Sequence, residues 1–250
     1  MNILIIMSDQ HHKGVLGCSG DEIIRTPNLD MLAKKGVRFD NCYAAAPLCV
    51  PSRMSFLTSR LPSNNRVWSE TELPSTAPTM AHVMRLAGYE TSLIGRMHFI
   101  GQDQRHGFEN RPIGEYTARY PGSKTLGGKP WQHYASSTAG QFRKGIENSG
   151  YGNTFYQHFD EKVTHETCNF LENKKNNKQK PFFAVVGYVL PHCPYIAPKE
   201  SFDYYLDKVK IPQVESVLPQ SVRDFRRIRG IDSPPISDKR TRIARAAYYA

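Results

Sequence analysis

The sequence lacks long apolar runs and has few cysteines, and each absence excludes a class of protein. Its longest apolar stretches are residues 3–7 and 182–190, the second interrupted only by Gly187, whereas a membrane-spanning helix needs about 20 apolar residues. The five cysteines are an odd number without a Cys-x-x-Cys pair, which argues against a disulfide scaffold and a structural zinc site. We therefore expect no membrane span, and each thiol needs its own explanation.

The apolar run at residues 3–7 is also too short for a secretory leader, because Ser8 and Asp9 interrupt it. As it stands, the sequence predicts a cytoplasmic protein, or a periplasmic or secreted one if a leader has been removed. The 250 residues include 22 % charged residues, 18 glycines and 17 prolines, a composition that excludes collagen, coiled coils and extensive disorder. Such a chain is long enough for one sizeable core, or for two small domains at most.

Acidic residues are in the minority, 23 against 33 Lys and Arg, so the net charge is +10. This excess favours anionic partners, such as nucleic acids, anionic lipids and small sulfated or phosphorylated molecules. Much of it lies in two runs, which are explained more simply as solvated faces. No nucleic-acid-binding motif accompanies them, so nucleic-acid binding is a minor alternative. The runs are Lys174, Lys175, Lys178 and Lys180, and Arg223, Arg226, Arg227, Arg229, Lys239, Arg240, Arg242 and Arg245.

Three apolar segments, residues 3–7, 89–94 and 182–190, predict buried parallel strands, because they show no polar alternation. Helices are expected between them, and this order predicts an α/β fold with a mostly parallel open sheet flanked by helices. The first expected helix runs from Pro27 to before Gly36, with Leu29 and Leu32 facing inward. The second covers residues 79–87, with Met80, Val83, Met84 and Ala87 facing inward. The third covers residues 161–172.

Two further stretches bear on domain organisation. Residues 105–153 are rich in Gly, Ser, Tyr and Gln, which predicts an irregular surface excursion near the site. At the other end, the apolar period of Ile243, Ala246, Ala247 and Ala250 continues to the last residue. We therefore expect residues 1–250 to be the N-terminal part of a longer catalytic domain, with no partner strand after this last helix and with part of the sheet edge and core exposed.

Reactive side chains follow each of the three predicted strands. Asp9 and Gln10 follow the first strand, Arg96 and His98 the second, and His192 the third. In open α/β sheets, ligands bind at the carboxyl ends of the strands, so these side chains are placed where chemistry occurs. A single histidine after a strand is more often structural, and the argument depends on the coincidence of all three placements.

Cys49 is predicted to open a helix, because Pro51 suits a first helical turn. The unpaired N–H groups and the positive end of the dipole at such a position favour anions and lower the pKa of a thiol. A small buried thiol at the start of a helix would leave the same pattern. The residues alone favour neither interpretation.

The segment Cys49-Val50-Pro51-Ser52-Arg53, followed by Leu57-Thr58-Ser59-Arg60, resembles the sulfatase signature C-x-P-S-R with L-T-G-R, with Ser59 in place of the usual Gly. Four further blocks in the same order, residues 2–10, 26–43, 88–98 and 191–195, are similar to the same family. The chain thus resembles the type I, formylglycine-dependent sulfatases of the alkaline-phosphatase-like superfamily. Residues 97–111 resemble the choline-sulfatase-like and arylsulfatase branch.

This resemblance implies an alkaline-phosphatase-like α/β fold and the hydrolysis of sulfate esters or sulfamates. In the family, the cysteine equivalent to Cys49 is oxidised to formylglycine by a formylglycine-generating enzyme. One hydroxyl of the hydrated aldehyde attacks sulfur, and the other collapses to release sulfate and restore the aldehyde. The implied substrate is a small-molecule or saccharide sulfate ester.

The resemblance also implies a divalent metal, usually Ca²⁺, a hard ion that prefers oxygen ligands. Asp9, Gln10 and the converted Cys49 would be its ligands. Many relatives have a second Asp where this chain has Gln10, which makes Gln10 the less secure ligand. The remaining ligands of the family are expected beyond residue 250.

The other implied site residues are cationic or imidazole groups around the transferring sulfuryl group. Arg53 would orient the gem-diol, Arg96 and His192 would bind sulfate oxygens, and His98 would support the nucleophile or the sulfate. Arg96 stands where Lys is commoner, and its planar, bidentate group would handle the leaving group differently. We expect all seven site residues to converge on one pocket.

Two alternatives stay open. A formylglycine-dependent phosphonate or phosphodiester monoester hydrolase shares the signature and the metal chemistry, and both transferred groups are anionic tetrahedra. A basic nucleic-acid-binding protein, or a non-catalytic protein with unmodified Cys49, belongs to a different class. Modification of Cys49 separates the enzymes from the non-catalytic protein.

Overall fold

The computed structural model describes residues 1–115, 142–176, 180–213 and 217–250. The chain divides into two compact units. The first, here called the sheet unit, comprises Met1–Asp9, Asp40–Trp131 and His158–Val189. The second, the helical unit, comprises Gln10–Phe39, Gln132–Gln157 and Leu190–Ala250.

In its described residues, the sheet unit has four parallel strands in the order β1-β5-β2-β3. They are β1 (Ile3–Met7), β5 (Phe182–Gly187), β2 (Glu90–Gly95) and β3 (Asn110–Ile113). The interior strand β5 pairs with both β1 and β2, and all six of its residues are buried. A parallel sheet needs crossover connections and cover on both faces, and the expected α/β class is confirmed.

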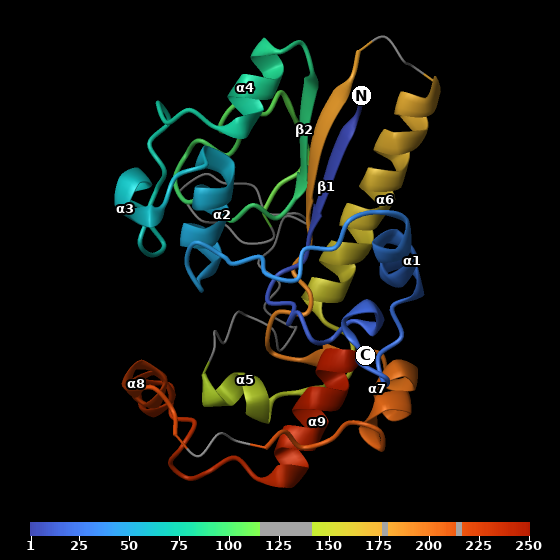
Figure 1. The fold of residues 1–250 in the computed structure, drawn as a ribbon, viewed down its shortest axis with the longest axis vertical. Coiled ribbons are helices and arrows are strands. Elements are labelled where there is room, and N and C mark those ends of the chain that lie inside the picture. The colour runs from blue at the N-terminus through green and yellow to red at the C-terminus, as the bar shows by residue number, and fades with distance from the viewer. Residues whose placement is uncertain (116–141, 177–179, 214–216) are drawn as a thin grey trace. The chain divides into compact units, whose positions relative to one another are not determined.

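Helices cover both faces of this sheet (Figure 1). On one face, α2 (Cys49–Thr58) and α4 (Met80–Leu86) enclose the core of the unit, in which Met54 and Leu57 pack with Leu93 of β2. On the other face lies α6 (Phe155–Asn176), whose Phe170 ring meets Phe182 edge-on at 5.2 Å. The short helix α3 (Pro62–Asn65) follows α2.

Burial of β1 differs from the sequence prediction. Its side chains alternate, with Leu4 37 % and Ile6 61 % exposed, while Ile3, Ile5 and Met7 pack on the core. Successive side chains of a strand point to opposite faces of the sheet, and the described part of the chain leaves one face of this edge strand partly uncovered. The two other strands are buried as predicted and span 90–95 and 182–187.

The predicted helices exist, but the inward faces of two of them are wrong in part. In α1 (Pro27–Lys35), Leu29 and Leu32 are exposed, because polar contacts attach this helix to its unit: Asp30 accepts the Cys18 N–H at 2.7 Å. In α4, Met80 and Met84 reach the core, whereas Val83 and Ala87 are exposed. Helix α6 begins and ends several residues outside the predicted 161–172.

The expected surface excursion at 105–153 is also wrong for much of its described part. Strand β3 lies in it, and His106, Phe108 and Glu115 are buried. The short helix α5 (Arg143–Glu147) and strand β4 (Gly150–Tyr151) also lie in this stretch. The middle of that stretch, residues 116–141, lies outside the described residues.

The helical unit has its own core between α7 (Lys199–Leu206) and α9 (Asp238–Tyr249). Ala246 and Ala247 of α9 are buried there, so the apolar period at the end of the sequence packs within this unit. The unit also contains the 3-10 helix η1 (Gly17–Ser19), the parallel pair β4 and β6 (Ile196–Ala197), and α8 (Gln220–Ile228).

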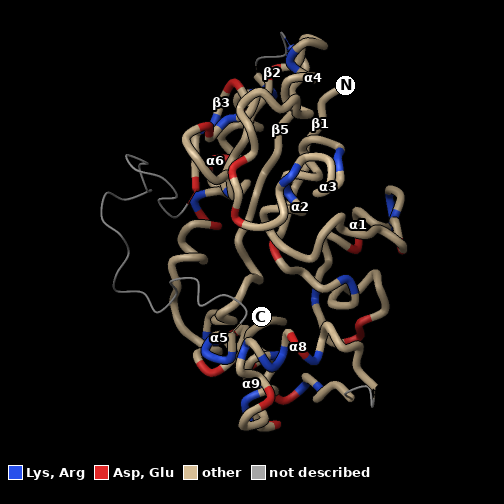
Figure 2. Tube along the Cα trace, turned by 90° about the vertical axis from the view of Figure 1, so that its left-hand side faces the viewer, with Lys and Arg blue, Asp and Glu red and all other residues tan. Residues whose placement is uncertain are grey.

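The basic run on α8 and α9 forms blue bands on these helices in Figure 2. On α8, Arg226 binds Asp232 at 2.5 Å and Arg227 binds Asp224 at 2.9 Å. These arginines are therefore partly neutralised by acids of the same unit. None of the helices in the described ranges is long and apolar enough to cross a membrane.

Candidate active site

Asp9 lies just beyond the carboxyl end of β1, where its buried carboxylate meets two arginines of the sheet unit. Its Oδ2 atom lies 3.1 Å from Nη2 of Arg53 and 3.0 Å from Nε of Arg96. The three side chains are 8 %, 5 % and 1 % exposed. Buried charges are tolerated when they are paired and hydrogen-bonded. The cluster has one negative and two positive groups, so its excess charge is positive.

Arg53 comes from the first turns of α2 and joins this helix to the end of β2. Besides its ion pair with Asp9, it donates from Nη1 to the carbonyl oxygen of Arg96 at 3.0 Å. The backbone of Arg96 in turn donates its N–H to the carbonyl of Gly187 at 2.8 Å. A Cβ on Gly187 would lie 1.8 Å from the Arg96 carbonyl oxygen, so only glycine permits this approach.

His98 is buried beside Arg96, and the contact between them fixes its tautomer. Nη2 of Arg96 lies 2.8 Å from Nδ1 of His98. Because a guanidinium can only donate, Nδ1 accepts and the neutral ring carries its proton on Nε2. That Nε2 atom lies 3.7 Å from Oε1 of the exposed Glu70. His98 therefore presents an N–H group at Nε2.

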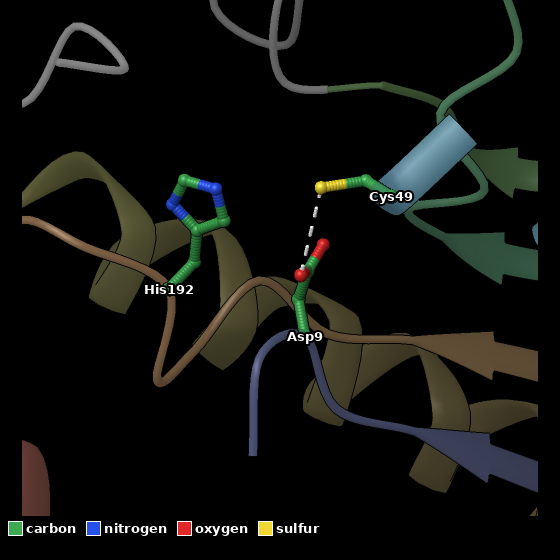
Figure 3. Close-up of side chains that lie close together, drawn as sticks. All are labelled: Asp9, Cys49 and His192. Atoms are coloured by element: carbon green, nitrogen blue, oxygen red, sulfur yellow. Dashed lines mark hydrogen bonds between the residues drawn. The ribbon is translucent and has the colours of Figure 1, made fainter. Parts of the chain in front are cut away.

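Cys49 is the first residue of α2, and its thiol points toward Asp9 (Figure 3). Sγ lies 3.9 Å from Oδ1 of Asp9. Burial raises the pKa of the Cys49 thiol, and the negative charge of Asp9 raises it further, while Arg96 and Arg53 oppose the shift without reversing it. This direction is opposite to the lowered pKa expected for a thiol at a helix N-terminus. The unmodified side chain is thus not predisposed to ionise.

Gln10 and His192 belong to the helical unit. Gln10 has a left-handed backbone with φ of 66°, and its Oε1 accepts the N–H of Cys193 at 3.4 Å. His192 is buried, donates from Nδ1 to the Cys193 carbonyl at 2.7 Å, and meets the ring of Tyr156 edge-on. The loop after β5 and the loop after β1 are therefore joined here.

The structure thus brings together five of the predicted site residues in the sheet unit and two in the helical unit. The five are Asp9, Cys49, Arg53, Arg96 and His98, and the two are Gln10 and His192. Convergence of all seven on one pocket stays a prediction.

Two residues that the sequence analysis did not select also hold the site. Oε1 of Glu115 accepts the N–H groups of Met97 and His98. In the helical unit, the Tyr248 hydroxyl donates to the Gln10 carbonyl at 2.8 Å and accepts the His12 N–H at 2.6 Å. Both act on backbone from 17 to 238 positions away, so no local pattern identifies them.

The donors fit a hard divalent cation in kind. Asp9 offers a carboxylate and Gln10 a neutral amide oxygen, the ligand types that Ca²⁺ prefers. One oxygen of Asp9 faces Cys49, and the other is engaged by two arginines. A Ca²⁺ ion takes about 6–8 oxygens, more than these two side chains can offer.

Comparison with known proteins gives a consistent assignment. The family model described as "Sulfatase" matches residues 1–228. A choline-sulfatase of Rhizobium meliloti (strain 1021) is 33 % identical over 273 aligned residues, which cover 100 % of this chain and 50 % of the relative. The chain therefore spans about half the length of this relative.

Solved structures agree on the fold. The structure of BT4656, in complex with its substrate D-glucosamine-2-N,6-O-disulfate, matches with a TM-score of 0.62 at 21 % identity, over 98 % of this chain and 52 % of that one. The phosphonate monoester hydrolase of Agrobacterium radiobacter matches with a TM-score of 0.70 at 17 % identity, over 99 % and 55 %. At these identities the structures show a shared fold alone. Since the family model covers most of the sequence, including the Cys49 signature and the strands that carry Asp9 and Arg96, the chain belongs to the sulfatase family.

Proposed function

We propose that this chain carries the N-terminal half of the active site of an enzyme that hydrolyses sulfate esters or sulfamates. The observation that carries the proposal is the buried cluster beside Cys49, in which Arg53 and Arg96 both bind Asp9 and Arg96 binds His98. A family signature residue next to two guanidinium groups and an imidazole N–H suits a substrate with a negatively charged sulfuryl group.

Each residue of the cluster has a role that its contacts support. Arg96, held on β5 by its backbone, places a fixed positive charge beside Cys49. His98 offers its Nε2 N–H as a donor to an anionic oxygen. Asp9 keeps both guanidinium groups in place. Such preorganised donors stabilise charge that develops during transfer without having to reorient.

We further propose that Cys49 is converted to formylglycine by a formylglycine-generating enzyme. Formylglycine, as its hydrate, would supply the hydroxyl that attacks sulfur and a second one whose collapse releases sulfate. Arg53 lies one helical turn from Cys49 in α2, so it can orient a polar group at that position.

A divalent metal, most readily Ca²⁺, completes this proposal. Asp9 and Gln10 would hold it together with the converted Cys49, and the ion would polarise oxygens bound to it. The other ligands are expected from outside residues 1–250.

For the substrate we propose a small-molecule or saccharide sulfate ester. The relative that is 33 % identical is named a choline-sulfatase, and BT4656 takes a disulfated glucosamine as its substrate. The two named substrates share a sulfuryl group on a small polar molecule, and the positive cluster around Asp9 suits that shared part. These residues do not select the alcohol or amine that carries the sulfuryl group.

A second candidate is a phosphonate or phosphodiester monoester hydrolase. The phosphonate monoester hydrolase of Agrobacterium radiobacter shares the fold, and the support for this candidate is the chemistry of the transferred group. Sulfate and phosphonate monoesters are both anionic tetrahedra, so the arginines and His98 would bind either.

The test uses the complete protein, co-expressed with a formylglycine-generating enzyme. Intact-mass analysis of the Cys49 peptide should show the change from thiol to aldehyde. Turnover of an aryl sulfate should then exceed that of the matching aryl phosphonate and depend on Ca²⁺. Protein with Cys49→Ala is the inactive control. Faster phosphonate turnover would favour the second candidate, and unmodified Cys49 from a competent host would contradict both.

A further inference from the structure

We propose that Glu115 is a positioning residue that fixes the turn from Arg96 to His98 and thereby holds the His98 ring against Arg96. The proposal rests on the function proposed above and adds a residue to that site. Glu115 lies two residues after the end of β3, in the sheet unit.

A single oxygen of Glu115 collects the donors that define this turn. Oε1 accepts the N–H of Met97 at 2.8 Å, the N–H of His98 at 2.5 Å and Nη2 of Arg111 at 3.1 Å. The residue is 7 % exposed, so these bonds form away from competing water. Two successive backbone N–H groups that point at one acceptor form a concave anion site, and here the carboxylate of Glu115 occupies it.

The turn needs these hydrogen bonds because His98 has a left-handed backbone, with φ of 62°. This region is sparsely populated for residues other than glycine, and it persists where surrounding contacts hold it. The backbone dihedrals of His98 decide where its ring goes. With the turn held, Nδ1 of His98 lies 2.8 Å from Nη2 of Arg96, and that arginine in turn binds Asp9.

Arg111 holds the carboxylate of Glu115 in place. This side chain is 6 % exposed, and it donates to Oε1 of Gln104 at 2.8 Å as well as to Glu115. Gln104 then donates to the carbonyls of Phe99 and Gly101, directly after His98. Glu115 thus binds the backbone of Met97 and His98 directly. It is also connected to the segment after His98 through Arg111 and Gln104. Glu115 therefore has a fixed position from which it constrains the turn.

Three variants separate acceptor geometry from charge, each made in the complete protein with converted Cys49. Glu115→Leu removes the acceptor, and kcat should fall about 100-fold with little change in KM, because displacement of a group that acts in the transition state affects kcat. Glu115→Gln keeps a carbonyl acceptor at the same reach and should retain most of kcat. Glu115→Asp keeps the charge but shortens the reach, so it should lose more kcat than Glu115→Gln.

A purely structural role predicts other results. It would lower the yield of folded, converted protein but leave kcat per aldehyde-containing molecule unchanged. Two controls sharpen this comparison. Glu109→Leu removes a half-exposed carboxylate that accepts the Thr91 N–H at 3.1 Å on the same segment, and it should not change kcat. In a His98→Ala background, Glu115→Leu should cause no further loss, because both changes remove one interaction.

The outcomes distinguish this proposal from the proposed function. A wild-type protein without sulfatase turnover contradicts the function. An active wild type in which Glu115→Leu has normal kcat, or in which its loss adds fully to that of His98→Ala, overturns the role of Glu115. If Glu115→Leu does not fold, the order of Glu115→Gln and Glu115→Asp decides, and a higher kcat for Glu115→Asp overturns the proposal. Amide exchange at Met97 and His98 should be faster in Glu115→Asp than in Glu115→Gln.

Discussion

At the scale of single residues, Asp9 has two tasks that are usually separate. It is the candidate anionic ligand of a metal, and it is the counter-charge of two buried arginines. The sequence predicts the first task from its place after a strand. The second depends on Arg53 and Arg96, which are 44 and 87 positions away, so it emerges only from the fold.

Replacement of Asp9 should therefore cost stability as well as activity. Asp9→Asn leaves two guanidinium groups buried without their counter-charge, and we expect the free energy of unfolding to fall by about 3 kcal/mol. Metal-dependent turnover should be lost. Gln10→Ala is the matched control, because it removes a neutral oxygen that water can replace, at about 1 kcal/mol. Urea unfolding and turnover against Ca²⁺ concentration measure both effects. Equal behaviour of the two variants would argue against the double task of Asp9.

Asp21 is a second residue whose charge supports the fold, in the helical unit. Burial alone would raise the pKa of its carboxyl, but hydrogen bonds from Tyr249 and the N–H groups of Ile24 and Ile23 outweigh it and lower the pKa below the ordinary 3.8. A lowered pKa in the folded state means that this contribution is present above pH 3.8 and is lost as the pH falls through the lower, folded value.

We therefore expect Asp21→Asn to flatten the acid side of the stability profile. The melting temperature of the wild type should drop as the pH falls below about 4, and the variant should start lower and drop less. Tyr249→Phe removes the donor that lies 2.6 Å from Oδ2 of Asp21, and it should give part of the same effect. Parallel wild-type and Asp21→Asn profiles would show that the carboxylate does not matter to folding.

At the scale of elements, the close approach of β2 and β5 determines where Arg96 lies. Gly187 ends β5 where the backbone of Arg96 crosses it, and Gly95 has φ of 89° directly before Arg96. Such contacts have no tolerance for a side chain, because interiors are close-packed.

Gly187→Ala should consequently displace the arginine. Its Cβ would lie 1.8 Å from the Arg96 carbonyl oxygen, so the strand end must shift, and we expect a loss of about 3 kcal/mol in the free energy of unfolding. Gly114→Ala is the control, since nothing lies within 4 Å of its Cβ. Urea denaturation compares the two, and a neutral Gly187→Ala would contradict the close approach of Gly187 to Arg96.

Much of the element order could be predicted from the sequence, but the burial of side chains could be predicted only for the two interior strands. Strands 90–95 and 182–187 are recognisable by their continuous apolar residues, and Pro51 places the start of α2. The exposure of Leu4 and Leu32 depends on which elements cover them, which is not a local property. Likewise, Glu115 acts on His98 across 17 positions, in a segment whose composition predicts an irregular surface stretch.

At the scale of the whole molecule, the chain covers half of its curated relative, and its candidate metal donors offer fewer oxygens than a Ca²⁺ ion takes. The net charge of +10 favours approach of anionic substrates in general and does not by itself select one.

Residues 1–250 expressed alone should consequently hydrolyse sulfate esters poorly, even with Cys49 converted. A Ca²⁺ ion takes about 6–8 oxygen ligands, and Asp9, Gln10 and the converted Cys49 would supply three side chains toward it. Aryl-sulfate turnover of this piece, compared with that of the complete protein after the same co-expression, is the measurement. Comparable Ca²⁺-dependent rates would show that these residues hold a complete site.

The interior place of β5 has a consequence for the time course of synthesis. Ile3 of β1 pairs with Phe183, and Glu90 of β2 pairs with Phe182. Both strands are therefore synthesised well before β5, the strand with which they pair. At roughly 5–20 residues per second, a ribosome needs about 10–35 seconds to extend the chain from Ile3 to Phe183. During that interval the apolar strands are open to wrong partners, including the same segments of neighbouring nascent chains. The backbone bond from Arg96 to Gly187 forms only after β5 has been made, and holding factors that shield the first 180 residues would raise the yield of the sheet unit in a cell.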